Sequence, residues 1–411
     1  MNANVSVSGR RYDLDWLRVL AILTVFVYHT TRFFNLGDWH VKNPVNYVGV
    51  DVLERFVEIW MMPLIFVISG ASLFYALDKG GAGKFIKDKA LRLLVTLVVG
   101  VFTFSILQVY LERITHGQFF GTFFDFLPHY FEGVYKDQNP ASGNFAYAGM
   151  HLWYLLILFV YSVACYPLLH WLKGAGLGAF GRLGDFLARP GAVYLLALPV
   201  PLLDAIISDT PLGEISSGGW DILLYLPFFL AGFVLVSNAR LQARIKATPW
   251  QSLVIAILSC AAVLPLKFGL APATMIPLGE LIDDPLASLS AICFILACMG
   301  FAMRRLNFTT PALKYANEAV LPFYILHQTV LLSVGYFVVQ WDIPDLAKWL
   351  VILVGSFAVI MGLYEYLIRR VNLLRFLFGM KPIKAATQPV AQPAQTISSS
   401  GASSDGFSRS G

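Results

Sequence analysis

The chain has 411 residues, of which 57% are hydrophobic and only 13% are charged, and its formal net charge is +5 at pH 7. An ordinary soluble domain carries about 25% charged residues, so this composition excludes an ordinary soluble enzyme and favours a membrane protein. The basic excess follows membrane orientation and gives no support to a nucleic-acid partner.

Apolar segments long enough to cross a bilayer, roughly 20 residues each, recur along the chain. They lie at about 15–34, 48–77, 90–111, 150–171, 191–208, 220–237, 249–267, 286–303, 316–340 and 347–368. We therefore predict an all-α polytopic membrane protein with about ten transmembrane helices. Residues 1–380 are expected to form one integral-membrane domain, and the polar residues 381–411 a disordered cytoplasmic tail.

The basic residues predict how these helices are oriented. If the N-terminus is cytoplasmic, 23 of the 30 Lys and Arg residues fall on the inner side of the membrane and seven on the outer side. Such an excess of inner positive charge is the rule for membrane proteins. Both termini are therefore predicted to be cytoplasmic, and the bacterial inner membrane is the expected location.

The first apolar helix carries Arg18 and His29, eleven residues apart. At about 100° per residue the two side chains point within roughly 20° of each other, and Arg32 lies near the same line. A charge at membrane depth costs several kcal/mol unless it faces a protein interior or a wet cavity. We call Arg18, His29 and Arg32 the polar stripe of this helix, and it predicts a functional site. Taken alone, Arg18 could be a snorkelling anchor and His29 a hydrogen-bonded interior histidine.

The second apolar helix places Asp51, Glu54 and Glu58 on one face. Glu58 lies deep enough to need a partner, for which His29 and Arg32 are the candidates. Further along, Ser69 and the glycine after it permit close helix packing or the approach of a ligand.

The third helix begins with Lys89 and Arg92, spaced so that both can reach one cavity mouth. The pair suits a donor that carries phosphates, although a cluster of inner positive charges needs no such function. The long outer loop that follows is rich in aromatic residues, including Phe123 and Phe124, and leads into His151 and Trp153. It is either an interfacial aromatic belt or a lid that stacks on a sugar ring.

The ninth apolar segment carries His327 at a depth comparable with that of His29, beyond a helix-kinking Pro322. The four cysteines lie in apolar segments without CxxC spacing, so neither a disulfide framework nor a metal site is expected.

Several segments, in order, resemble the membrane acyltransferase family 3, and within it a group of glucan-biosynthesis proteins. They are LDWLR-x10-H ending at His29, DWH-VKN from Asp38, FVISG, the basic pair before Leu93, HLWYL from His151, LPFYILHQ ending at Gln328 and the closing YE…R…RFLFGM. The family often has Arg-x-x-Arg at the third helix, whereas this chain has Lys89-x-x-Arg92, and Lys binds phosphate as a point charge rather than bidentately.

The resemblance implies transfer of an acyl group, often acetyl or succinyl, from cytoplasmic acyl-CoA to a hydroxyl of an extracytoplasmic glycan or glucan. No permanently bound cofactor is expected. In this reaction His29 would be the general base, and Arg32 or His327 would stabilise the oxyanion. Direct transfer and an acyl-histidine intermediate both remain open. The expected site residues are His29, Arg32, Glu58 and His327 for catalysis, Arg18, Lys89, Arg92 and Ser69 for the donor, and Trp39, His40, His151, Trp153, Phe123 and Phe124 for the acceptor.

A proton-coupled secondary transporter of a small polar or anionic solute is the alternative, because helices interrupted by Pro and Gly and intramembrane charges would serve it as well. Against a transporter, the two halves show no internal repeat, and the basic cluster near the third helix suits an anionic donor.

Overall fold

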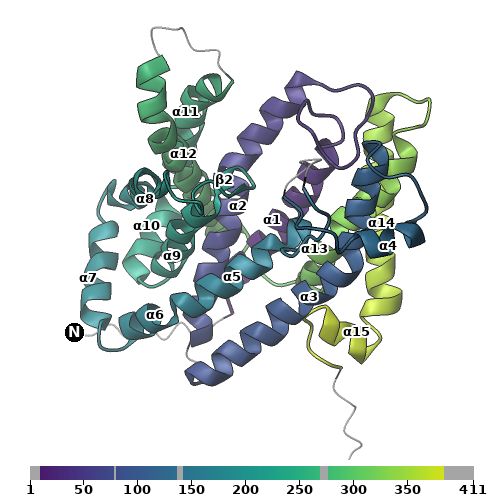
Figure 1. The fold of residues 1–411 in the computed structure, drawn as a ribbon. Coiled ribbons are helices and arrows are strands. Elements are labelled where there is room, and N and C mark those ends of the chain that lie inside the picture. Colours follow the sequence, from purple (N-terminus) through teal and green to yellow (C-terminus); the bar gives the residue numbers. More distant parts are fainter. Residues whose placement is uncertain (1–9, 78–79, 137–141, 269–275, 384–411) are drawn as a thin grey trace, which may run out of the picture.

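The computed structural model describes residues 10–77, 80–136, 142–268 and 276–383, and these are helical almost throughout (Figure 1). The α-helices are α1 (Tyr12–Thr31), α2 (Val48–Ala76), α3 (Ala82–Thr115), α4 (Phe123–His129), α5 (Trp153–Ala164), α6 (Tyr166–Lys173), α7 (Leu177–Leu187), α8 (Pro199–Ile207), α9 (Tyr225–Leu235), α10 (Ala239–Ala247), α11 (Pro249–Lys267), α12 (Ile276–Arg305), α13 (Pro311–Val338), α14 (Asp345–Leu363) and α15 (Asn372–Leu377).

Short elements complete the chain. They are the 3-10 turns η2 (Met150–Leu152), η3 (Ala192–Ala197) and η4 (Ile222–Leu224), the π-helical turn η6 (Tyr364–Ile368), and an antiparallel pair of strands, β1 (Ser216–Ser217) and β2 (Trp220–Asp221). In the described residues this pair is the only sheet, so the predicted helical fold class is confirmed. The predicted tail over 381–411 lies outside the described residues except for 381–383.

Among the described residues, six helices are long and apolar enough to cross a membrane. The number of candidate spans rises to as many as nine if each of three bent helix pairs is one span. The six are α2, α3, α11, α12, α13 and α14. Helix α1 is not among them, since Asp13, Asp15 and Arg18 lie in its first two turns. An integral membrane protein is therefore supported, and the number ten stays a prediction.

Three segments expected to be straight spans lie next to or across a sharp bend. The segment predicted over 150–171 bends by 51° between α5 and α6, where Pro167 cannot donate a backbone hydrogen bond. The segment over 191–208 forms only η3 and α8, and it folds back on α7 at 115° around Gly191, whose φ is +80°. The segment over 220–237 ends in a 104° bend where Asn238 caps α10.

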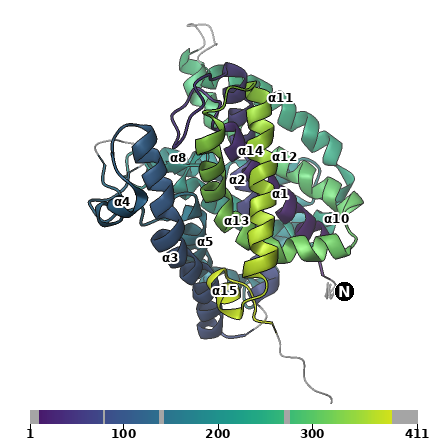
Figure 2. The same ribbon diagram turned by 90° about the vertical axis from the view of Figure 1, so that its right-hand side faces the viewer.

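Helix α1 lies at the centre of the helical assembly, in contact with α2, α12, α13 and α14 (Figures 1 and 2). Around it the backbones of α2 and α9 come very close. A Cβ added at Gly70 would lie 1.8 Å from the Phe229 carbonyl oxygen, and one at Gly232 would lie 2.0 Å from that of Val67. The close packing predicted at Gly70 is therefore confirmed, because no larger residue fits there.

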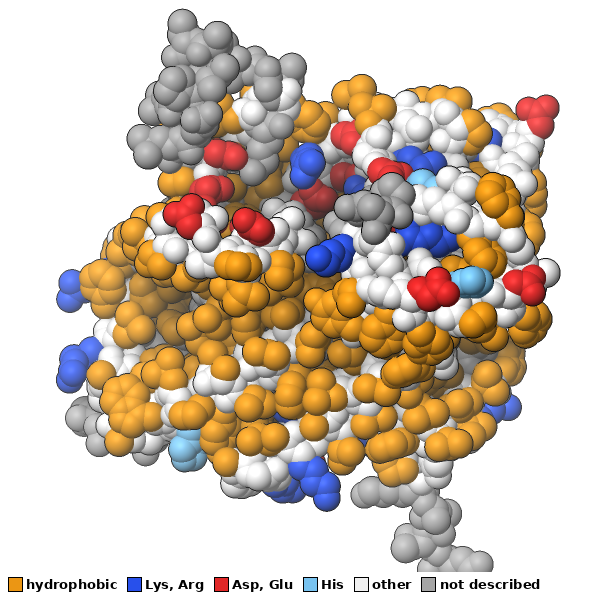
Figure 3. Space-filling model, viewed as in Figure 1, with side chains coloured by type: hydrophobic (Ala, Val, Ile, Leu, Met, Phe, Trp, Pro, Cys, Tyr) orange, Lys and Arg blue, Asp and Glu red, His pale blue; other side chains and the backbone are white. Residues whose placement is uncertain are grey.

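The outer surface of the assembly suits contact with lipid. Figure 3 shows a broad hydrophobic band, with Lys and Arg side chains at its left and lower margins and, together with Asp, Glu and His, above it. Large apolar side chains stay exposed on helices of spanning length, for example Val98, Leu258 and Val354. Helix α1 begins and α15 ends at the lower side of the molecule in Figures 1 and 2. The start of α1 and the end of α15 therefore lie on the same side of the molecule.

Candidate active site

The polar stripe of α1 faces two cavities. One, of about 1210 Å³, is lined by His29 and Arg32, and the other, of about 520 Å³, is lined by Arg18. We name them the outer and the inner cavity, after the predicted orientation of α1. Charged side chains on an apolar helix therefore face hollows inside the protein, which is where the cost of desolvation is lowest.

The two cavities lie close together, because residues less than one helical turn apart on the same helix line one cavity and the other. Helices α1, α2 and α5 contribute neighbouring residues to the two linings, and α13 contributes Tyr324 to both. The pairs, outer residue first, are Val25 and Ile22, Met62 and Ile65, and Trp153 and Tyr154. Three helical residues correspond to a rise of about 4.5 Å. The partition between the cavities is therefore about as thick as one layer of side chains, and Tyr324 is part of it.

The hydrogen bonds of His29 define its tautomer. Its Nδ1 lies 2.9 Å from the Val25 carbonyl oxygen and 3.2 Å from Nε2 of His327, whose own Nδ1 lies 2.6 Å from the Tyr324 carbonyl oxygen. A carbonyl oxygen only accepts, so both Nδ1 atoms carry a proton and Nε2 of His327 is an acceptor. Nε2 of the half-buried His29 is then unprotonated, and this ring lines the outer cavity. It is poised to accept a proton.

His327 itself is only 1% exposed and belongs to neither cavity lining in the described residues. Its ring lies against His29 on one side and makes an edge contact with His151 at 4.8 Å between centroids. The expected role as an oxyanion donor has no support from this geometry, because Nε2 points at His29 rather than into the cavity. His327 is placed to orient His29.

The partners of the acidic residues on α2 differ from those expected. Glu58 accepts a hydrogen bond of 2.6 Å from the Tyr28 hydroxyl and pairs with Arg55 at 3.2 Å. Arg32 pairs instead with Glu54, at 3.4 Å. The prediction that Glu58 pairs with His29 or Arg32 was wrong, since the way α1 crosses α2 places Tyr28 opposite Glu58. Glu58 and Arg32 both line the outer cavity, as expected of site residues.

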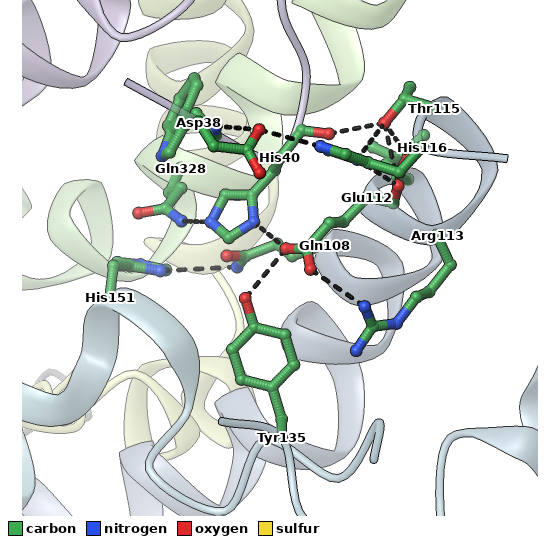
Figure 4. Close-up of polar contacts among 12 residues, drawn as sticks. Asp38, His40, Gln108, Glu112, Arg113, Thr115, His116, Tyr135, His151 and Gln328 are labelled. Atoms are coloured by element: carbon green, nitrogen blue, oxygen red, sulfur yellow. Dashed lines mark hydrogen bonds and ion pairs between the residues drawn. The ribbon is translucent and has the colours of Figure 1, made fainter. Parts of the chain in front are cut away.

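A hydrogen-bond network holds His40 at the side of the outer cavity (Figure 4). Nδ1 of His40 donates to the carboxylate of Glu112 on α3, and its Nε2 lies 3.0 Å from the side-chain amide of Gln328 on α13. Tyr135 from the outer loop donates to the same carboxylate at 2.9 Å. Glu112, which is 1% exposed, was not among the residues predicted from the sequence. The network ties the loop after α1 to α3, α13 and the outer loop.

Two ionisable groups outside the spanning helices help to fix this loop. Burial lowers the pKa of Lys42 to about 8, so it stays largely protonated at neutral pH and donates to the carbonyl oxygens of Arg32 and Asn35. Burial alone would lower the pKa of His116, but its hydrogen bonds to Asp38 and to the Glu112 carbonyl raise it above the usual value. Both groups favour a single loop conformation.

Only some of the expected acceptor residues reach the outer cavity. Trp39, His40, His151 and Trp153 line it, whereas Phe123 and Phe124 line neither cavity. Thr122 forms a capping box that starts α4 at Phe123. In this helix Phe123 packs on Tyr110 and Phe124 is 77% exposed. The same loop contributes Tyr135 and Tyr147 to the cavity instead.

The inner cavity brings together the four residues expected at the donor. Arg18 donates to Ser72 at 2.8 Å and pairs with Asp15 at 3.1 Å, and Ser69 shares a hydrogen bond of 2.5 Å with Tyr154. Lys89 and Arg92 complete the set, and the part of the chain that the structure describes provides neither with an ion pair. The cavity therefore presents cationic side chains to whatever enters it. Tyr154 was not singled out by the sequence.

The described residues form neither a candidate metal site nor a disulfide. No group of three or more His, Cys, Asp or Glu side chains there is arranged to hold a metal ion, and the four cysteines are free.

In this helical protein a cavity lined by His29 lies on one side of a thin partition and a cationic cavity lies on the other. This is an organisation that suits a membrane-embedded group-transfer enzyme. Residues 11–365 match the model of a family described as an acyltransferase domain, and the chain belongs to this acyltransferase family.

Its curated relatives include glucans biosynthesis protein C of Salmonella schwarzengrund (strain CVM19633), 22% identical over 394 residues that cover 91% of this chain and 95% of the relative. The protein of the same name from Salmonella agona (strain SL483) is also 22% identical, over 387 residues, with the same coverage. No solved structure matches the chain significantly. The transporter alternative is not favoured by these similarities.

Proposed function

We propose that the protein transfers an acetyl- or succinyl-type group from cytoplasmic acyl-CoA to a hydroxyl of an extracytoplasmic carbohydrate such as a glucan. The observation that carries the proposal is the partition at Tyr324, with the free Nε2 of His29 on its outer side and cationic residues, among them Arg92, on its inner side. A substrate on each side of the membrane can meet the other there without either crossing it.

The chemistry follows from the tautomer of His29. Nε2 of His29 takes the proton of the acceptor hydroxyl as the hydroxyl oxygen bonds to the thioester carbon. The carbon–sulfur bond then breaks, and the CoA thiolate leaves and takes up that proton. Arg32, on the wall of the outer cavity, is the candidate to stabilise the oxyanion that forms in between.

The orientation is part of the proposal. With α1 as a further span, the nine candidate spans become ten, and both termini lie in the cytoplasm of a bacterium whose inner membrane holds the protein. A cysteine introduced in the outer loop, residues 113–149, is expected to react with a membrane-impermeant maleimide in intact cells. A cysteine at residues 80–84 is expected to react only after the membrane is permeabilised. The reverse pattern would overturn the orientation.

The decisive experiment is an assay of the purified full-length protein in detergent, with no second compartment. Release of free CoA thiol is followed for a panel of acyl-CoAs with and without extracytoplasmic glucans. We expect acceptor-dependent thiol release that is lost in His29→Ala. Absence of turnover, together with solute uptake by proteoliposomes, would replace the proposal with the transporter. Radiolabelled acyl group that stays on the protein when the acceptor is omitted would replace direct transfer with an acyl-histidine intermediate.

A further inference from the structure

The closing motif of the sequence folds into a strap under the inner cavity. The strap comprises α15 and the residues that follow it to 383, and it lies beside α3 and η6 at the lower end of the molecule (Figure 2). Its two ends are joined, because the side-chain oxygen of Asn372 accepts a hydrogen bond of 2.8 Å from the backbone NH of Ile383. The family match ends at residue 365, before the strap.

A buried arginine holds the strap in shape. Arg375 is 7% exposed, and its Nε donates to the Lys381 carbonyl oxygen at 2.7 Å. One terminal nitrogen donates to the Arg369 carbonyl at 3.1 Å, and the other pairs with Glu318 on α13 at 2.8 Å. A buried guanidinium that is fully engaged in this way fixes a chain segment firmly. The backbone at Lys381 is thereby anchored to α13.

A glycine lets the strap touch the helix that carries the basic pair. Gly379 has φ +67°, a left-handed conformation that suits glycine. A Cβ added there would lie 2.8 Å from the Arg92 carbonyl oxygen and 3.1 Å from the Thr96 hydroxyl. Phe378 beside it is buried and packs on Phe104 of α3. The strap is therefore seated directly on the α3 backbone at Arg92.

This seating places one more cation at the inner cavity. Lys381 is exposed and lines the cavity together with Arg18, Lys84, Lys89 and Arg92, and among the described residues Asp88 supplies the only carboxylate of that lining. Asp88 is already paired with Lys84 at 3.4 Å. Cations held together in this way repel one another unless an anion enters. A ligand with several separate phosphates matches such an arrangement better than a single carboxylate does.

We infer that the strap completes the donor site, and that Lys381 contacts a phosphate of the acyl-CoA proposed above as donor. The inference rests on that proposed function for the identity of the ligand. CoA carries a diphosphate and a separate ribose phosphate, and Arg18, Arg92 and Lys381 approach the cavity from three different elements. Gly379 and Arg375 are positioning residues for Lys381 and touch no ligand themselves.

The test measures the Kd of CoA for the full-length protein in detergent by calorimetry. Lys381→Ala is expected to raise the Kd about tenfold, as the loss of one charge-assisted contact does. Lys87→Ala removes the same charge from an exposed position on α3 that does not line the cavity, and it is expected to leave the Kd within about twofold of wild type. Because both variants lower the net charge by one, the difference between them separates the local contact from the general attraction of the protein for an anion.

A double-mutant cycle tests whether the strap acts through Lys381. Gly379→Ala forces the strap off the Arg92 carbonyl, so it is expected to weaken CoA binding although every charge is kept. In the Gly379→Ala, Lys381→Ala double variant the two effects are expected not to add, since one contact cannot be lost twice. Additive effects would overturn the positioning role of Gly379.

The outcomes separate this inference from the proposed function. If Arg18→Ala and Arg92→Ala weaken CoA binding while Lys381→Ala behaves like Lys87→Ala, the inference about the strap is wrong and the proposed donor stands. If the wild-type protein binds no CoA, both are wrong. A salt titration that weakens CoA binding less in Lys381→Ala than in wild type would support the contact, because salt screens charge pairs.

Discussion

The outer and the inner cavity differ in how their charged side chains are paired. The charged side chains that line the outer cavity at α1 and α2 have partners within the protein, as in the contacts of Arg32 with Glu54 and of Glu58 with Arg55. In the inner cavity Lys89 and Arg92 have no ion pair among the described residues. Paired charges hold a fixed shape and do not require a charged ligand, whereas unpaired cations are stabilised by an anion. We therefore expect the outer cavity to orient a neutral hydroxyl beside His29 and the inner cavity to attract an anion.

The largest effect is expected from His29→Ala. Loss of a general base typically lowers turnover by about 10²–10⁴-fold, and CoA binding is expected to stay unchanged because His29 lines only the outer cavity. Initial rates at saturating substrates and the Kd of CoA measure the two quantities. The control is His129→Ala, on the exposed part of the outer loop. Turnover above a tenth of wild type would make His29 a packing residue.

His327→Ala is expected to lower kcat by up to about 10²-fold, the cost of a misplaced catalytic group, with little change in KM for either substrate. His327→Gln keeps a side-chain acceptor for the Nδ1 proton of His29, so it is expected to recover part of the lost rate. A merely structural role would lower the amount of folded protein equally in both variants. A loss confined to KM would contradict the positioning role.

Arg18→Ala and Arg92→Ala are expected to weaken binding of the donor rather than to lower turnover at saturating substrates. Each lost charge-assisted contact to phosphate costs about 1.5–3 kcal/mol, which corresponds to a roughly 10- to 150-fold weaker Kd for acyl-CoA. Acceptor KM at saturating donor is expected to stay the same, because both arginines line the inner cavity alone. Should both variants bind acyl-CoA normally, the donor is not linked to CoA.

The smallest effect separates two aromatic residues that the sequence grouped together. Trp153→Ala is expected to raise acceptor KM by roughly 2- to 13-fold, the equivalent of about 0.5–1.5 kcal/mol of aromatic contact. Phe124→Ala is expected to leave it unchanged, since Phe124 lies outside the cavity. Kinetics with a soluble glucan acceptor provide the measurement. Equal effects would mean that the outer loop closes over the acceptor in a way that this structure does not show.

The stripe of α1 could be predicted because it depends on one rigid helix. The 3.6-residue period alone sets the relative direction of Arg18 and His29, and the cavities lie where that direction points. The partner of Glu58 could not be predicted, since it depends on how two helices cross. Tyr154 and Tyr324 lie within the motifs HLWYL and LPFYILHQ, but their place at the cavities could not be predicted, because a tyrosine in an apolar helix looks like any large core residue until its neighbours are known.

The breaks in the helices were harder to predict than the helices themselves. Apolar composition identified the segment over 150–171, but the bend at Pro167 changes no count of apolar residues. The position of Phe123 and Phe124 depended on a local hydrogen bond, the capping box at Thr122, which outweighed the general tendency of aromatic residues to line a sugar site. Short-range geometry decided both outcomes.

The thin partition at Tyr324 also bears on the energy supply of the cell. A membrane that stores a proton gradient is discharged by any continuous file of water, and this protein is hollowed from both faces to within about one layer of side chains. The phenol ring of Tyr324, anchored by its hydroxyl to the His151 carbonyl, therefore works as an electrical insulator as well as a wall. An enzyme that lets two substrates meet across a bilayer, as proposed above, has to keep protons from using the same meeting point, and between turnovers the ring of Tyr324 closes that point.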